Sequence, residues 1–253
     1  MANPDVRAMP RPNPANPSAT PHVIIPGHDL VPVPDPNQLD YYRCIGQFRL
    51  FVGSSFGRGT GTLIQAGANV GILTCAHNLC IRGTSTFKDS ADFTPCQGPE
   101  GSPFEPIAVP QSNMWISPGY KISPVAGGRY DYAVVRLKSS ELPPPSELGP
   151  LPQMQPLTLD SGIAMQVTGY PSAVFDTTMA YSVGSFTPPA VTNGLVYYNA
   201  STTEGSSGSG VCFKDNLQSI TAVHVGGSEA AMVNAGVYLT REIIEEITEV
   251  LAS

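Results

Sequence analysis

Short runs of apolar and β-branched residues, each ended by turn residues, recur along the sequence from Tyr41 to Leu239. The runs lie at 48–53, 61–67, 70–76, 114–117, 132–137, 164–171, 179–186, 195–200, 210–213, 219–227 and 235–239. Such regularly spaced runs are typical of β-sandwiches and β-barrels. The 25 Gly and 26 Pro in 253 residues, with only 13% charged residues, agree with short strands and many turns. The sequence therefore predicts an all-β fold.

The chain divides at the Pro-rich segment ELPPPSELGPLP (141–152). We predict one β-rich half at 41–145 and a second at 146–253. Residues 1–38 carry ten prolines, and we interpret 1–40 as an extended arm or a propeptide. An amphipathic helix is predicted at 241–252, with Thr240 as its N-cap. Its apolar face consists of Ile243, Ile244, Ile247, Val250 and Leu251.

Charge and hydropathy limit the classes of partner. The net charge is −7 and the isoelectric point is about 5.0, which disfavours a nucleic-acid partner. No apolar run approaches the roughly 18 residues of a membrane span, and the first 30 residues lack the apolar core of a signal peptide. The five cysteines are Cys44, Cys75, Cys80, Cys96 and Cys212. An odd number mildly favours a reducing compartment.

The segment ASTTEGSSGSGVCF (200–213) contains six consecutive Gly and Ser residues, 205–210. Such a run is usually a flexible spacer. Here it lies between two strand-like runs, GLVYYN (194–199) and VCF (211–213). A tight turn that needs glycine is therefore the better interpretation.

A serine in this turn becomes a nucleophile only with a base and an orienting acid. His77 ends the run GILTCAH, and Asp131 precedes YAVVRL. Taken singly, His77 is typical of a packed residue and Asp131 of a turn residue. Together the order His77, Asp131, Ser207 is that of the chymotrypsin class of serine proteases. Gly205 and Gly208 flank Ser207 in that pattern, and the N–H groups of Gly205 and Ser207 are predicted to form the oxyanion hole.

Six short motifs in order resemble those of the glutamyl endopeptidases, which are serine proteases of the chymotrypsin fold. The motifs are VIIPGHD (23–29), ILTCAH (72–77), DYAVV (131–135), VTGYP (167–171), TTEGSSGS (202–209) and HVGG (224–227). The resemblance implies two antiparallel six-stranded β-barrels, chymotrypsin-like, with the site between them. The first barrel would carry His77 and Asp131, and the second Ser207.

The resemblance also implies a substrate preference. It places Thr202 and His224 in the wall of the specificity pocket and Gly227 along the substrate backbone. An imidazole and a hydroxyl can hydrogen-bond a Glu or Asp side chain. A preference for Lys or Arg is disfavoured, because Ser201 stands where such enzymes carry an acid.

In the family the free amino group of the mature N-terminus helps to bind the acidic side chain. This implies cleavage after His22 to expose Val23. Three positions depart from the family: Glu204 replaces a glycine near the pocket rim, Gly210 replaces a proline, and no signal peptide is present although the family is mostly secreted. The compartment is therefore left open. We expect polypeptide substrates, a monomer, no membrane association, no cofactor and no metal.

Four alternatives stay open at this level. Cys75, His77 and Cys80 could be three of four zinc ligands, although no second cluster completes the set. The chain could instead be a catalytically silent protease fold used for binding, or a protease of the same fold with non-acidic specificity. An esterase is disfavoured because Ser209 breaks the G-x-S-x-G elbow around Ser207.

Overall fold

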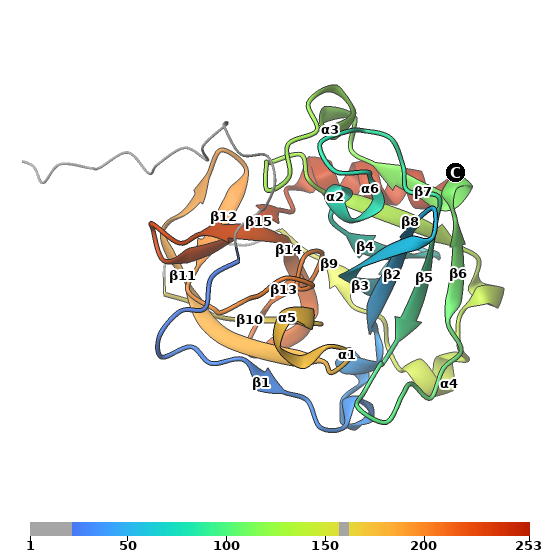
Figure 1. The fold of residues 1–253 in the computed structure, drawn as a ribbon, viewed down its shortest axis with the longest axis horizontal. Helices are drawn as coiled ribbons and strands as arrows, with labels where there is room; N and C mark the ends of the chain where they lie inside the picture. The colour runs from blue at the N-terminus through green and yellow to red at the C-terminus, as the bar shows by residue number, and fades with distance from the viewer. Residues whose placement is uncertain (1–21, 157–161) are drawn as a thin grey trace, which may run out of the picture.

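The computed structural model describes residues 22–156 and 162–253. Two β-sheets lie side by side, one from each half of the chain, as Figure 1 shows. Among the described residues, no helix has the length and apolar character needed to cross a membrane. The all-β class predicted from the alternating runs is confirmed.

The first sheet has seven antiparallel strands. In spatial order they are β6 (Ile107–Pro110), β5 (Ser90–Pro95), β2 (Ile45–Val52), β3 (Ser55–Ala66), β4 (Asn69–Thr74), β8 (Ala133–Leu137) and β7 (Met114–Ile116). Burial alternates along β5 and β6, as expected for strands with one face on the core. Within the described residues the two edge strands do not pair, so this sheet is curled but open. It differs in this detail from the closed six-stranded barrel that was predicted.

The second sheet closes. Its strands follow the order β11 (Ala180–Thr192), β10 (Ala164–Gly169), β13 (Gly210–Phe213), β14 (Asn216–Ser228), β15 (Val233–Tyr238) and β12 (Leu195–Tyr198). A pairing between β11 and β12 completes the barrel. Two short strands attach to its rim: β1 (Val31–Pro32) pairs with β11, and β9 (Gln153–Met154) pairs with β14.

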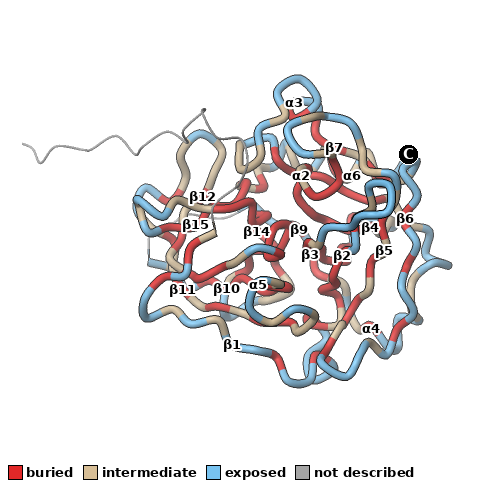
Figure 2. Tube along the Cα trace, in the orientation of Figure 1, coloured by how far each residue is buried: buried red, intermediate tan, exposed pale blue. Residues whose placement is uncertain are grey.

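Short helical turns connect the strands. The α-helical ones are α1 (Asp40–Arg43), α2 (Ala76–Leu79), α3 (Pro118–Ile122), α4 (Pro145–Leu148) and α5 (Ser172–Phe175). The 3₁₀ turns are η1 (Pro36–Gln38), η2 (Gln111–Asn113) and η3 (Ser139–Glu141). Figure 2 shows that buried residues concentrate where the two sheets face each other, while the connections are largely exposed.

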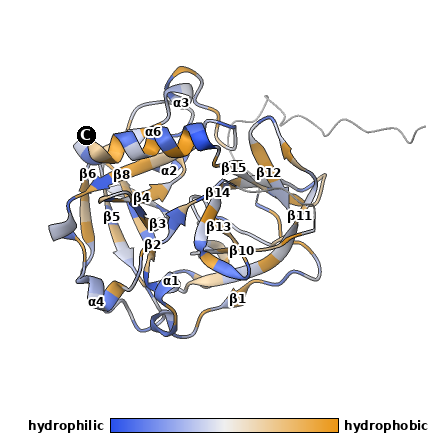
Figure 3. Cartoon of the chain, turned by 180° about the vertical axis from the view of Figure 1, so that it is seen from behind, coloured by the Kyte–Doolittle hydropathy of each residue, from blue (hydrophilic) through white to orange (hydrophobic). Residues whose placement is uncertain are grey.

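Helix α6 (Arg241–Ala252) ends the chain and confirms the predicted C-terminal helix. The Thr240 side chain accepts a hydrogen bond from the N–H of Ile243, which satisfies one of the free donors of the first turn. Ile247 and Leu251 are buried on the apolar side. Figure 3 shows this helix lying along the first sheet, and the Tyr132 hydroxyl donates to Glu246 at 2.6 Å.

One hydrophobic cluster joins the two halves. It contains Ile64 and Leu73 of the first sheet together with Val223 and Val237 of the second. These side chains are nearly inaccessible to solvent, and each contributes about 1.5–3 kcal/mol by burial. This shared core fixes the position of the first sheet relative to the second, and so the relative positions of the residues at their junction.

The segment before the first sheet lies on the second barrel. Val31 and Pro32 pair with Tyr181 and Ala180, and the N–H of Val33 donates to the carbonyl of Met179. Of the arm predicted at 1–40, residues 1–21 lie outside the described residues. In the remainder, residues 23–33 bond to the second half of the chain, whereas Asn37 in η1 bonds to Arg43 and Cys96 of the first half.

Candidate functional site

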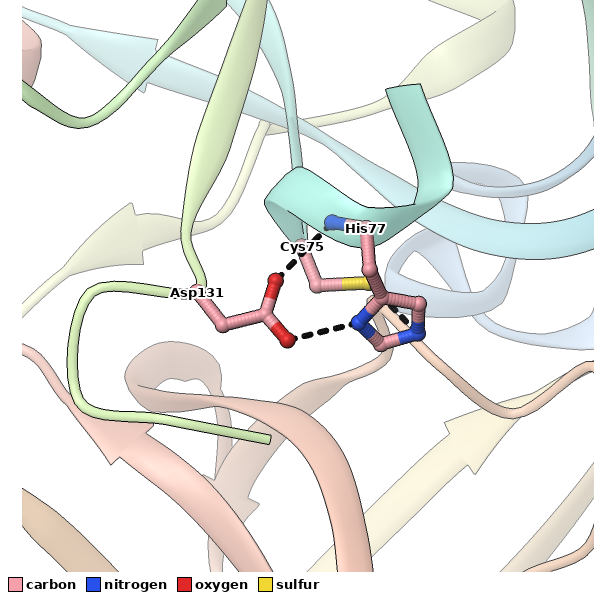
Figure 4. A group of neighbouring side chains, drawn as sticks. All are labelled: Cys75, His77 and Asp131. Atoms are coloured by element: carbon pink, nitrogen blue, oxygen red, sulfur yellow. Dashed lines mark hydrogen bonds and ion pairs between the residues drawn. The ribbon is translucent and has the colours of Figure 1, made fainter. Parts of the chain in front are cut away.

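His77 and Asp131 are brought together by two neighbouring strands. His77 lies in α2, directly after β4, and Asp131 lies just before β8. Strands β4 and β8 are antiparallel partners, with Thr74 opposite Ala133, so the end of one strand meets the beginning of the other. His77 Nδ1 lies 2.6 Å from Asp131 Oδ2, and the His77 N–H donates to Oδ1 at 2.9 Å (Figure 4). Both interactions orient the imidazole toward the carboxylate.

The pair is shielded from solvent. Asp131 is fully buried, and the His77 side chain is 17% exposed. The N–H of Gly127 also donates to Asp131 Oδ2, at 2.6 Å. Burial by itself lowers the pKa of His77, but the interactions with the Asp131 carboxylate and with Cys75 together outweigh it and raise the pKa well above 6.5. An imidazole held in this way can accept a proton and is stabilised once charged.

Cys75 lies on the other side of the imidazole. Its Sγ is 3.5 Å from His77 Nε2, and burial raises the pKa of the thiol. Cys75, His77 and Asp131 offer three potential metal ligands within 4.8 Å of one another; Cys80, the third residue of the zinc alternative, is not in this group. Two ligand atoms on one tetrahedral zinc lie ~3.3 Å apart. The 2.6 Å contact between Asp131 and His77 is that of a hydrogen bond instead.

The Gly/Ser run is an ordered turn. Gly205 and Gly208 have positive φ angles of 92° and 89°. A Cβ at 208 would lie 2.1 Å from the Thr60 carbonyl oxygen, and one at 205 would lie 2.3 Å from the Tyr170 carbonyl oxygen. Glycine is therefore required at both positions, as the sequence analysis expects for a tight turn.

Several hydrogen bonds tie this turn to its surroundings. The Ser207 carbonyl accepts from the N–H of Thr60 at 2.9 Å and from the side-chain amide of Asn78 at 2.8 Å. The N–H of Gly208 donates to the His224 carbonyl. In the described part of the chain, the N–H groups of Gly205 and Ser207 donate to no acceptor. Two buried and available donors at this place are what an oxyanion hole needs.

The Ser207 hydroxyl contacts His22. Its Oγ lies 3.3 Å from His22 Nε2. Within the described residues there is no hydrogen bond between Ser207 and His77, whose Nε2 faces Cys75. The structure thus joins His77 with Asp131, and Ser207 with the residue before Val23. His22 lies close enough to His77 for their charges to interact.

We call Tyr198, Thr202, His224 and Asn234 the His224 cluster. His224 is fully buried in β14; its Nε2 lies 3.0 Å from His22 Nδ1, and its Nδ1 lies 2.6 Å from the Tyr198 hydroxyl. Burial, followed by the nearby His22 and His77, lowers the pKa of His224 well below 6.5. The imidazole is therefore neutral near pH 7 and presents one N–H donor.

Val23 is fixed by the same cluster. Its N–H donates to Asn234 Oδ1 at 3.1 Å, and its carbonyl accepts from the Asn234 amide at 2.8 Å and the Thr202 N–H at 3.0 Å. The Thr202 hydroxyl donates to Asn234 Oδ1 at 2.9 Å. Two residues on, the N–H of Ile25 donates to the Ser201 hydroxyl. The backbone from 23 to 25 is therefore docked beside Ser207 in the uncut chain.

The remaining predicted residues lie around this centre. Gly227 pairs with Asn234 between β14 and β15. Ser201 is buried and neutral, and Glu204 is exposed, with its carbonyl bonded to the Ser172 hydroxyl. His22, Tyr198 and Asn234 were missed by the sequence analysis. In the sequence, only His22 could have been found, from its position next to Val23. Tyr198 and Asn234 reach the cluster only through the pairing of their strands.

Comparisons with known proteins agree with this architecture. Residues 59–225 match the model of the trypsin-like peptidase domain. A Glu endopeptidase structure is 22% identical with a TM-score of 0.71, covering 91% of this chain and all of that one. The protease Anisep from Arthrobacter nicotinovorans is 19% identical with a TM-score of 0.69, covering 89% of this chain and 99% of that one.

A third structure, the thermostable serine protease AL20 from an extremophilic microorganism, is 17% identical with a TM-score of 0.69. The matched region covers 85% of this chain and 99% of that protease. The comparison with curated proteins gives no match. At these identities the structural matches show the fold, which is the predicted chymotrypsin-like one.

Proposed function

Because the chain belongs to the family of trypsin-like peptidases, we propose that it is a serine endopeptidase that cleaves after Glu or Asp. The observation that carries the proposal is the hydrogen-bonded pair of His77 and Asp131, in a helical turn whose next residue, Asn78, donates to the Ser207 carbonyl. A buried carboxylate on Nδ1 fixes the tautomer that leaves Nε2 able to accept a proton.

The reaction follows from these roles. His77 Nε2 takes the proton of the Ser207 hydroxyl as Oγ forms a bond to the substrate carbonyl carbon. The N–H groups of Gly205 and Ser207 stabilise the resulting oxyanion. The carbon–nitrogen bond then breaks, and the amine leaves with the proton from His77. Water, activated by the same imidazole, hydrolyses the acyl-enzyme and restores the Ser207 hydroxyl.

Two further observations support the acidic preference. The neutral His224 ring is an Nε2–H donor in the tautomer whose Nδ1 accepts from the Tyr198 hydroxyl, 2.6 Å away; the same hydroxyl also lies 3.2 Å from the Ala235 carbonyl. Burial raises the pKa of Tyr198 well above 10, so this hydroxyl keeps its proton. The Thr202 hydroxyl lies 3.5 Å from His22 Nδ1, the same atom that contacts His224 Nε2. Neutral donors and no carboxylate at Ser201 suit an anionic side chain better than a cationic one.

Cleavage after His22 would add a positive charge. The new α-amino group of Val23 would lie next to Asn234 Oδ1, where its N–H lies now. An ammonium group close to a substrate carboxylate is a charge-assisted donor, stronger than a neutral one. We therefore assign the mature start to Val23. We also keep the division of the chain at 41–145 and 146–253 as part of this proposal.

Peptide-library profiling tests the function. The full chain is built with residues 19–22 replaced by the recognition sequence of a site-specific protease, so that cutting the folded protein leaves Val23 first. Cleavage of library peptides after Glu or Asp is expected. The matched Ser207→Ala protein should show none, since removing the nucleophile costs about 10⁶ in turnover. Cleavage by both proteins would contradict the role of Ser207, and cleavage after other residues would refute the acidic preference.

A further inference from the structure

The His22 side chain bridges the candidate nucleophile and the His224 cluster. Its Nε2 lies 3.3 Å from Ser207 Oγ, and its Nδ1 lies 3.0 Å from His224 Nε2 and 3.5 Å from the Thr202 hydroxyl. The rings of His22 and His224 are 5.2 Å apart between centroids. One side chain therefore contacts the nucleophile and both residues expected to recognise the substrate.

The backbone that follows His22 is bound to the second half of the chain. Val23 makes three hydrogen bonds to Thr202 and Asn234, and Ile25 makes two with the Ser201 hydroxyl. Val23 is 3% exposed. Cleavage after His22 would thus create a new amino group at a site where the chain is bound before the cut.

We propose that in the uncut chain His22 occupies the place of the substrate's acidic side chain, and that cleavage activates the protein by removing this occupant. The proposal rests on the proposed function. It differs from activation by insertion of a new N-terminus, because here the segment that would insert is already docked. In the uncut chain the His22 side chain then blocks the substrate site. The positive charge of the new α-amino group is a second, smaller effect of the cut.

The chemistry of the surroundings suits a neutral imidazole. Burial, followed by the charge of His77, lowers the pKa of His22 to about 3. The titratable groups that face it are His77 and His224, and no carboxylate of the described residues contacts the ring. A neutral ring with one donor and one acceptor can bond both Ser207 and His224. The Ser207 hydroxyl is thereby engaged away from His77.

His22 competes strongly with a substrate because it is attached to the chain next to the site. A group attached next to its binding site has an effective concentration of order millimolar. A peptide substrate at lower concentration competes poorly with it, and its apparent affinity falls by the fraction of chains with an open site. Removing the His22 ring should therefore restore activity even when the bond between His22 and Val23 is intact.

The test compares three uncut full-length proteins: wild type, His22→Ala and His28→Ala. His28 is the matched control, because it lies on the same docked segment but bonds the Val183 carbonyl, outside the His224 cluster. Hydrolysis of a Glu-containing peptide and labelling by a serine-directed phosphonate are measured, with intact mass confirming that Met1 or Ala2 still begins the chain. The cut protein that starts at Val23 is included as the reference for activity.

The expected result is that uncut His22→Ala reacts at least about tenfold faster than uncut wild type and uncut His28→Ala. The proposal is overturned if uncut His22→Ala stays as slow as wild type while the cut protein is active, because the free amino group is then what matters. The proposal is also overturned if the uncut wild type hydrolyses the peptide as fast as the cut protein does. If the cut protein is inactive, that result contradicts the proposed function instead.

A second measurement is independent of catalysis. The imidazole C–H resonances of His22 are followed by NMR from pH 5 to pH 8 in the uncut wild type, with His22→Ala used for assignment. An occluded ring shows no titration in this range, in keeping with its low pKa. A His22 ring that titrates near 6.5 is solvated, and that result overturns the occlusion whether or not the protein is a peptidase.

Discussion

In the first half of the molecule, His77 and Asp131 meet because β4 and β8 are direct neighbours in one sheet. In the second half, Ser207 and His224 contact His22, which lies 185 and 202 positions away in the sequence. The first half therefore prepares its acid–base pair from its own strands. The second half forms its turn and its His224 cluster, and the N-terminal segment contacts both through His22.

The electrostatics of the two halves differ in the same way. A buried carboxylate raises the pKa of His77, whereas burial without a carboxylate lowers the pKa values of His22 and His224. One imidazole is thus suited to carry a proton, and the other two are held neutral. Three neighbouring histidines thus differ in charge because their neighbours differ. Four substitutions in the cut protein test this difference between the two halves.

Asp131→Asn should have the largest effect. Loss of the carboxylate removes both the orienting contact and the stabilisation of the charged imidazole, and turnover should fall about 10⁴-fold. The base must be unprotonated, so in the wild type the rate should rise with pH through a midpoint above 6.5, the ordinary value that the carboxylate raises. A pH–rate profile should show this midpoint moving down in the variant. The matched control is Asp92→Asn in β5, and an unchanged midpoint in Asp131→Asn would contradict the pairing.

Gly208→Ala should come next, acting on the second half. Both the positive φ and the collision with the Thr60 carbonyl oppose a Cβ, so the free energy of unfolding should fall by about 4 kcal/mol. Gly67→Ala separates the two causes. Gly67 also has a positive φ but open space around it, so only about 1 kcal/mol is expected. Equal losses in denaturant unfolding would show that the collision contributes nothing.

Tyr198→Phe should change recognition more than chemistry. Without the hydroxyl, His224 loses the Nδ1 partner that, in the proposed function, leaves Nε2–H free for a substrate carboxylate. The KM for a Glu peptide should rise about tenfold, the loss of one hydrogen bond to a charged group, with kcat little changed. Tyr197→Phe on the same strand is the control. A fall in kcat with constant KM would place Tyr198 in the chemical step rather than in recognition.

Thr240→Ala should have the smallest effect. It removes the cap of α6, and about 1 kcal/mol of stability should be lost. Thr248→Ala, in the middle of the same helix, should be close to neutral because alanine is the better helix former there. Thermal unfolding checks both. A larger loss from Thr248→Ala would show that its hydrogen bond to the Ile244 carbonyl matters more than the cap.

Local patterns in the sequence predicted much of the fold. Runs that end in Gly, Pro or Asn marked the strands, and the spacing of Ile247 and Leu251 marked the buried side of α6. The closure of only one sheet was beyond such patterns. It depends on whether β11 and β12 at the edges of the second sheet can reach each other, and that is a long-range property.

The sequence specified the reactive groups of this protein: a serine in a turn that requires glycine at positions 205 and 208, and a histidine and an aspartate at the ends of strands. The tertiary structure alone decided which groups meet. Pairing of β4 with β8 joined His77 to Asp131, and docking of the N-terminal segment placed His22 on Ser207. The identity of a side chain depends on one residue alone. The distance between two side chains depends on how segments that are distant in the chain pack together.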